Sequence, residues 1–129
     1  MIQVTAAILQ KDHRILICQR PEGKSCALLW EFPGGKQEPH ESLEECLIRE
    51  CQEELGITIA NLHPFDTVVL EDKGLCLHFF TANIASGTLT RKEHAAFRWV
   101  DREELSQYSF CPSDTIMLER ANLNDLFGK

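Results

Sequence analysis

The stretch RECQEELG, at 49–56, places three glutamates on one turn of a predicted helix. A helix rotates by about 100° per residue, so Glu50, Glu53 and Glu54 fall in one sector, where like charges weaken the helix unless a cation lies between them. Oxygen ligands, with no thiol or imidazole among them, favour Mg²⁺ or Mn²⁺ over zinc. Because Mg²⁺ is typically shared with substrate phosphates, this turn predicts a metal site and a phosphorylated substrate.

The segment before this turn has the composition of a phosphate-binding loop. Pro33, Gly34 and Gly35 allow the backbone to approach a ligand closely, and Lys36 adds a positive charge just before a helix N-terminus. For an isolated E-x-x-E-E pattern, the alternative interpretation is a solvated acidic helix face. Here loop and helix together indicate one site.

The helix that carries the glutamates has clear boundaries in the sequence. Ser42 and Glu45 have the spacing of a capping box, apolar side chains recur at every fourth position from Leu43 to Leu55, and Gly56 ends the pattern. The apolar stripe lies beside the glutamate sector. We therefore expect one face of this helix in the core and an acidic face next to it.

The rest of the chain predicts strands and short helices around this unit. Apolar, β-rich runs bounded by polar turns predict strands, and a D-x-x-E cap pattern and a proline at a first turn predict helices. The predicted strands are QVTAAIL (3–9), RILICQR (14–20), ALLWEF (27–32), ITIANL (57–62), FDTVVL (65–70), LCLHFFTANI (75–84) and AAFRWV (95–100), and the further helices are 101–108 and 112–123. Hairpins combined with strand–helix alternation favour an α/β fold whose mixed sheet has helices on both faces.

Composition indicates one globular domain spanning residues 1–129. Of the 129 residues, 43% are hydrophobic and 26% charged, and no repeat or linker divides them. No apolar run approaches the roughly 20 residues that cross a bilayer, and the start lacks a basic signal region, so we expect a cytoplasmic protein. The six cysteines form no C-x-x-C pair, so we expect free thiols.

The net charge of −7 argues against binding to nucleic-acid polymers or anionic membranes. A small anionic substrate is compatible with this charge if a metal ion bridges it to the protein. We therefore expect a small-molecule partner and no polymer or membrane partner.

From Gly35 onward the sequence has the form G-x5-E-x7-R-E-C-x-E-E-x-G-I. This pattern resembles the signature of the Nudix hydrolases and matches every fixed position, with Cys51 at a usually aliphatic position as the one mild departure. The resemblance implies an α/β/α sandwich with a mixed sheet. It also implies hydrolysis of a nucleoside diphosphate linked to another group, with Mg²⁺ or Mn²⁺ as cofactor.

The resemblance assigns roles to the acidic residues. The implied metal ligands are a main-chain carbonyl of the Gly34 to Gly35 turn, for which Gly35 is the candidate, and the side chains of Glu50, Glu53 and Glu54. Glu53 or Glu50 would remove the proton from the attacking water. Arg49 would orient a glutamate through an ion pair with Glu41 or Glu53. Glu93 is the candidate for a further loop carboxylate in the site, and a plain exposed turn residue is its alternative.

The segment WEFPGGK, 30–36, resembles the MutT-type branch of this family, whose members convert nucleoside triphosphates to NMP and pyrophosphate. By this resemblance Arg20 holds substrate phosphate, with simple exposure at a strand end as the alternative, and Gly34 and Lys36 contact the same substrate.

The base would be recognised at the start of the last helix. Asp114 is the candidate, because an ionised carboxylate accepts hydrogen bonds from an amine such as that of cytosine. Branch members resembling CTP pyrophosphohydrolase carry P-x-D at this place, whereas an ordinary first-turn acid is the alternative. Phe32 is a candidate to stack on the base, and His78 and Phe80 to line the pocket, although packing would explain each.

The expected function is therefore a Mg²⁺-dependent nucleoside triphosphate pyrophosphohydrolase with a cytosine or modified-nucleotide preference, acting as a monomer or weak dimer. An 8-oxo-dGTP diphosphatase is the alternative, because a protonated Asp114 could also donate a hydrogen bond. Hydrolysis of a nucleotide sugar, a dinucleoside polyphosphate or capped RNA, and a binding module without turnover, are further hypotheses.

Overall fold

A computed structural model describes residues 1–128 of the chain. Four strands precede the first helix, three strands follow it and two helices end the described chain, with two short 3-10 helices at Glu71–Lys73 and Leu105–Gln107. In chain order they are β1 (Ile2–Lys11), β2 (Arg14–Gln19), β3 (Trp30–Glu31), β4 (Gly34–Lys36), α1 (Leu43–Leu55), β5 (Ile57–Leu70), β6 (Leu75–Gly87), β7 (Ala96–Val100), α2 (Pro112–Arg120) and α3 (Leu123–Phe127).

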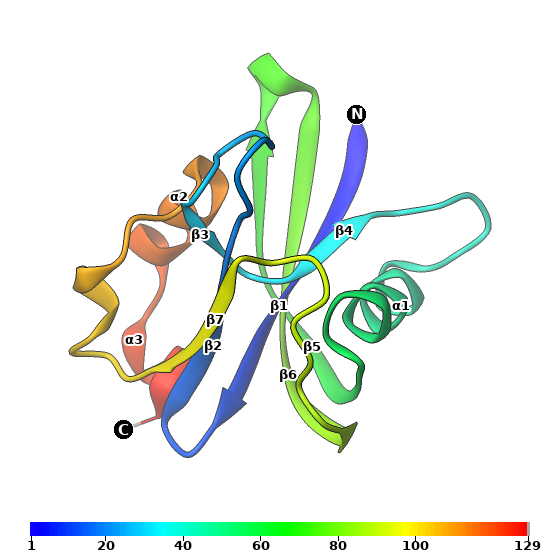
Figure 1. Cartoon of the computed structure of the whole chain (residues 1–129). Helices are drawn as coiled ribbons and strands as arrows, with labels where there is room; N and C mark the ends of the chain where they lie inside the picture. The colour runs from blue at the N-terminus through cyan, green and yellow to red at the C-terminus, as the bar shows by residue number, and fades with distance from the viewer. Residues whose placement is uncertain (129) are drawn as a thin grey trace.

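The seven strands form one mixed sheet, as predicted. The main order is β3-β2-β1-β6-β5, with β4 beside β1 and β7 beside β2. β1 and β6 run parallel, and the other pairs are antiparallel. β4 pairs with the first half of β1, over Val4–Ala6. β2 pairs with β1 only at Gln10 and Lys11, near its end. β2 and β4 therefore contact β1 at different points and diverge from it (Figure 1).

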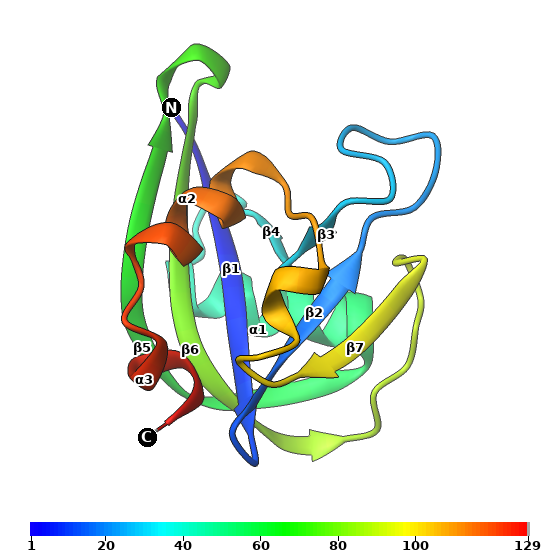
Figure 2. The same ribbon diagram turned by 90° about the vertical axis from the view of Figure 1, so that its left-hand side faces the viewer.

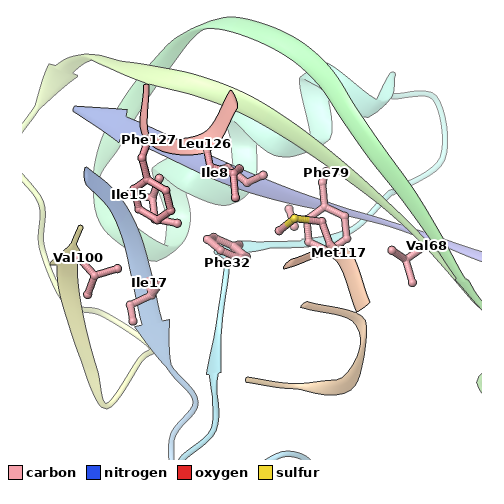
Figure 3. Close-up of a cluster of buried hydrophobic side chains, with 11 residues drawn as sticks. Ile8, Ile15, Ile17, Phe32, Val68, Phe79, Val100, Met117, Leu126 and Phe127 are labelled. Carbon is pink, nitrogen blue, oxygen red and sulfur yellow. The ribbon is translucent and has the colours of Figure 1, made fainter. Parts of the chain in front are cut away.

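Helices cover both faces of this sheet, which confirms the predicted α/β/α sandwich. α1 lies on one side, and α2 and α3 lie on the other (Figures 1 and 2). The α1 side buries Leu47, Cys51 and Leu55 against the sheet. The opposite side buries a second cluster that includes Phe32, Phe79 and Met117 (Figure 3).

Helix α1 has the predicted boundaries. The Glu45 N–H donates to Ser42 Oγ at 3.1 Å, and the Ser42 N–H donates to Glu45 Oε1 at 2.8 Å, which completes the capping box. Gly56 ends the helix with a φ of 69°, a conformation that glycine adopts without a Cβ penalty. The spacing of the glutamates on this helix is thus fixed by a well-defined start and end.

Other boundaries differ from the sequence predictions. Only Trp30–Glu31 of the 27–32 run is a strand, because Cys26 and Leu28 take positive φ values of 55° and 63° in the turn before it. The runs at 57–62 and 65–70 form one strand, β5, with register shifts.

Two predicted helices are also shorter than expected. The predicted 112–123 helix breaks after Arg120, and Asn122 caps α3. In the 101–108 segment, Asp101 and Glu104 accept each other's backbone N–H, but the helix covers only Leu105–Gln107.

The six cysteines are free thiols. No helix within residues 1–128 is both long and apolar enough to cross a membrane.

Candidate active site

A cavity of about 830 Å³ gathers most of the predicted site residues. It lies among β1, the β3–β4 segment, α1, the loop after β2, the tip of the β5–β6 hairpin and the start of α2. The predicted residues that line it are Arg20, Phe32, Gly34, Gly35, Lys36, Glu50, Glu54, Glu93 and Asp114. Arg49 and Glu53 are not among the lining residues.

Glu54 is the most deeply buried acid of the predicted trio, with 4% of the residue exposed. Burial raises the pKa of its carboxyl to about 10, and a hydrogen bond with Glu50 and the charges of Glu50, Glu31 and Glu93 contribute further in the same direction. Several carboxyl groups are therefore close enough to Glu54 to disfavour its ionised form.

The Glu53 side chain points away from the cavity and toward Arg49. It is 56% exposed and accepts a hydrogen bond from Arg49 Nη1 at 3.1 Å. Arg49 also donates from Nε to Glu41 Oε1 at 3.0 Å, from Nη2 to Glu41 Oε2 at 2.8 Å and from Nη1 to Glu50 Oε1 at 2.9 Å. The hydrogen bonds that Glu41 accepts from Arg49 and from the Glu38 backbone N–H lower the pKa of its carboxyl to about 2. The prediction gave Glu41 or Glu53 as the ion-pair partner of Arg49, and the structure has both pairs.

The two glycines of β4 allow two different close approaches. A Cβ on Gly34 would lie 1.9 Å from the Thr5 carbonyl oxygen. Because glycine has no Cβ, β4 can pair closely with β1 at this position. A Cβ on Gly35 would lie 2.4 Å from Cδ of Glu50, so the Glu50 carboxyl packs against the Gly35 backbone.

The carbonyls of these glycines face opposite ways. The Gly35 carbonyl faces β1, where the Thr5 hydroxyl donates to it at 3.4 Å and the Cys46 thiol at 3.6 Å. Main-chain hydrogen bonds at Pro33 and Gln37 set the alternation of the ladder, which turns the Gly34 carbonyl away from β1.

Glu31 on β3 is a site residue that the sequence predictions missed. Arg20 Nη1 donates to its carboxyl at 3.3 Å and 3.4 Å, and His94 Nε2 lies 3.0 Å from its Oε2. His94 Nε2 is also 3.6 Å from Oε1 of Glu54. The available signal was a single charged residue inside the apolar run ALLWEF.

Asp114 lies in the first turn of α2 and is 4% exposed. Its Oδ1 accepts a hydrogen bond from the Phe32 backbone N–H at 3.3 Å. Burial raises the pKa of this carboxyl to about 8, and the charge of Glu31 adds to the effect. Asp114 is thus a buried acid of the cavity wall, held by a residue 82 positions away.

The aromatic candidates lie mainly in the core. Phe32 is 3% exposed, stacks on Phe110 with centroids 5.9 Å apart and meets Phe79 edge to face, and its ring points into the buried cluster (Figure 3). His78 and Phe80 do not line the cavity: His78 Nε2 lies 2.6 Å from a Gln3 oxygen, and Phe80 packs on the α1 side. The pocket prediction for these two is wrong, because the β6 residues that line the cavity are Leu75 and Leu77, and His78 and Phe80 lie on the opposite face of the strand.

The donor set of the cavity fits a hard divalent cation, although no site is fully assembled. Within residues 1–128, no three acidic, histidine or cysteine side chains converge closely enough to hold one ion. Glu50 and Glu54 lie together, however, and Glu31 and Glu93 add charge around Glu54. Apart from His94, this set offers only oxygen ligands, which is the chemistry that Mg²⁺ or Mn²⁺ matches.

The chain is similar in sequence to known nucleotide hydrolases. A family model described as "NUDIX domain" matches residues 4–120. A "CTP pyrophosphohydrolase" of Escherichia coli (strain K12) is 41% identical over 121 residues, covering 92% of this chain and 90% of the relative. An "8-oxo-dGTP diphosphatase" of Proteus vulgaris is 39% identical over 88 residues, covering 67% and 79% respectively.

Solved structures agree with the fold. The solution structure of the E. coli ORF135 protein is 40% identical, with a TM-score of 0.69, and covers 92% of this chain and 86% of that one. The crystal structure of a MutT NUDIX hydrolase from Burkholderia pseudomallei is 26% identical, with a TM-score of 0.81, and covers 94% and 98% respectively.

Proposed function

The chain belongs to the Nudix hydrolase family, and we propose that it is a Mg²⁺-dependent pyrophosphohydrolase that converts a nucleoside triphosphate and water to a nucleoside monophosphate and diphosphate. We further propose that it prefers cytosine nucleotides and that residues 1–129 act as one domain. The observation that carries the proposal is the pair Glu50 and Glu54, which shares one cavity with the buried acid Asp114.

In this proposal Glu50 and Glu54 hold the metal ion. The Gly34 carbonyl, which is turned away from β1, is a better-placed main-chain ligand than that of Gly35. Glu93 lines the same cavity as a further ligand. When bound, the ion neutralises charge on the diphosphate and lowers the pKa of a coordinated water molecule.

The remaining groups bind and orient the substrate. Arg20, Lys24, Lys36 and Lys73 line the cavity and offer positive charge to the triphosphate. Glu50 and Glu53 are the two candidates for the base that removes a proton from water. Glu50 is favoured, because it lines the cavity, whereas Glu53 points outward to Arg49. Arg49 keeps the Glu50 carboxyl aligned through its hydrogen bond.

Asp114 would select the base. With a pKa near 8 its carboxyl is mainly protonated at neutral pH, so it offers one donor and one acceptor. Cytosine presents an amine and a ring nitrogen acceptor on its pairing edge, which complements both. The Proteus vulgaris relative supports the 8-oxo-dGTP alternative. An oxidised guanine also presents a donor beside an acceptor, so it complements the same protonated carboxyl.

Initial rates of pyrophosphate release test the proposal. The substrates are CTP, dCTP, 5-methyl-dCTP, 8-oxo-dGTP and the four common dNTPs, each with Mg²⁺ and with EDTA. We expect a cytosine nucleotide to have the highest kcat/KM and EDTA to abolish turnover. A tenfold lead for 8-oxo-dGTP would overturn the cytosine preference. Absence of release from every triphosphate would overturn the reaction itself, with Glu50→Gln as the inactive reference.

A further inference from the structure

His94 is a buried histidine that the proposed reaction does not use. It is 8% exposed and precedes β7, where the next residue, Ala95, donates its N–H to the Gln19 carbonyl at 2.9 Å. Its Nε2 lies 3.0 Å from Glu31 Oε2 and 3.6 Å from Glu54 Oε1. Its Nδ1 finds no hydrogen-bond partner within residues 1–128.

This arrangement fixes which nitrogen carries a hydrogen. Both neighbours of Nε2 are carboxyl oxygens, so we assign the hydrogen to Nε2, which donates to Glu31. The 3.6 Å separation from Glu54 is too long for a good hydrogen bond. The imidazole is therefore oriented through Glu31 and stands between that carboxyl and the one proposed to bind metal.

Arg20 competes for the same carboxyl. Its two contacts with Glu31, at 3.3 Å and 3.4 Å, are longer than those of a typical bidentate pair, while the His94 contact is 3.0 Å. Arg20 also donates from Nε to the Ser25 carbonyl at 2.9 Å. The guanidinium is thus held loosely by Glu31, which suits a group that must also reach substrate phosphate.

We propose that His94 is a positioning residue: its Nε2–H holds Glu31, which leaves Arg20 free to bind the substrate phosphates and keeps Glu31 away from Glu54. This inference rests on the proposed function, in which Arg20 contacts phosphate. Without the imidazole, Glu31 would take its hydrogen bonds from Arg20, and the nucleotide would lose that cation. The expected consequence is weaker nucleotide binding with a smaller effect on the chemical step.

Two variants separate this role from simple packing. The amide nitrogen of glutamine reaches the place of Nε2, whereas that of asparagine reaches only the place of Nδ1. We expect His94→Asn to raise KM about tenfold and to lower kcat by less than threefold, and His94→Gln to stay within threefold of the wild type in both. His63→Asn, at an exposed histidine of β5, is the matched control and should change neither.

A double variant tests the route through Glu31. Once Glu31→Gln has removed the carboxylate, adding His94→Asn should change KM less than twofold. Equal losses in His94→Asn and His94→Gln, or a full tenfold effect in the Glu31→Gln background, would overturn the inference. So would a His94→Asn KM within twofold of the wild type.

Binding measured without turnover separates this inference from the proposed function. Calorimetry with a non-hydrolysable cytidine triphosphate analogue and Mg²⁺ should show Kd about tenfold weaker in His94→Asn and near the wild-type value in His94→Gln. A wild type that binds the analogue but hydrolyses nothing would refute the proposed reaction, and the two variants would still decide the role of His94. A wild type that does not bind the analogue would refute both.

Discussion

Glu54 on α1 and Asp114 on α2 are buried carboxyl groups of the same cavity, carried by helices on opposite faces of the sheet. Burial is the largest cause of the raised pKa in both, to about 10 for Glu54 and about 8 for Asp114. Their surroundings differ. Glu54 lies among Glu50, Glu31 and Glu93, whereas Asp114 accepts a backbone N–H from Phe32 and has Glu31 as its charged neighbour.

The difference shows how one cavity can use carboxyl groups in two ways. At α1 several acids are crowded together, so the ionised form needs a cation from outside the chain. At α2 a single acid is stabilised as a neutral group that can both donate and accept a hydrogen bond. The first environment suits a metal and a diphosphate, and the second suits a nucleobase.

The largest expected effect is at the α1 end. Glu54→Gln should lower kcat by about 100-fold or more, because the proposed metal loses a direct ligand and even the outer-shell partners of a metal are typically worth about 10–100-fold. The same change should stabilise the metal-free protein at pH 7 by about 1–3 kcal/mol, because a buried acid that must stay neutral is replaced by a neutral amide. Kinetics with Mg²⁺ and urea unfolding in EDTA measure the two effects.

Glu44→Gln is the control for this pair of effects, because Glu44 is exposed on the same helix. It should leave both kcat and the unfolding free energy close to the wild-type values. If Glu54→Gln destabilised the metal-free protein, the crowding of carboxyl groups at this end would not be a cost that the metal relieves.

A second prediction contrasts the two glycines of β4. In Gly35→Ala the new Cβ meets the far end of the flexible Glu50 side chain, so we expect the fold to survive and kcat to fall by about 10–100-fold. In Gly34→Ala the Cβ meets the Thr5 backbone, so we expect a loss of about 3 kcal/mol of stability or more. Thermal unfolding and initial rates on both variants check this. Comparable losses of stability in the two would show that Glu50 cannot move aside.

The contrast between local and distant contacts explains how much of the site was predictable from sequence. On α1, local spacing predicts the Ser42 and Glu45 cap, the apolar stripe and the sector that holds the glutamates. Each of these groups is within about two helical turns of its partner along α1 or just before it. Local periodicity therefore carries the information.

The parts that sequence reasoning missed depend on distant contacts. Glu31 and His94 meet because β3 and β7 both pair with β2, and this pairing cannot be derived from spacing. The direction of Glu53 was also not predictable, because helical spacing gives a sector but not a rotamer, and Arg49 holds that side chain outside the cavity. Likewise the backbone turns at Cys26 and Leu28 depend on positive φ values that neither residue type signals.

A third prediction concerns base selection at the α2 end. Asp114→Ala should lower kcat/KM for the preferred nucleotide by about 5–150-fold, the range expected from 1–3 kcal/mol of base discrimination, and should flatten the preference among bases. Asp114→Asn should retain more activity, because an amide also offers one acceptor and a donor. Rates across the nucleotide panel measure this. Unchanged selectivity in Asp114→Ala would reduce Asp114 to a structural acid of the first helical turn.

The last prediction concerns the pH dependence of stability. The pKa of Asp114 is about 8 in the folded protein against an ordinary value of 3.8, so between these values the folded state keeps a proton that the unfolded state has released. Stability should therefore fall as the pH rises through this window and level off above pH 8, by at most about 1.4 kcal/mol per pH unit. In Asp114→Asn this contribution is absent, so the variant should gain stability over the wild type as the pH rises from 5 to 8.

Urea unfolding at several pH values in EDTA gives the difference directly, and Asp125→Asn, at an exposed first-turn acid of α3, should show none. A constant difference between Asp114→Asn and the wild type across this range would mean that Asp114 is already ionised in the folded protein, and the donor half of its proposed contact with the base would be lost.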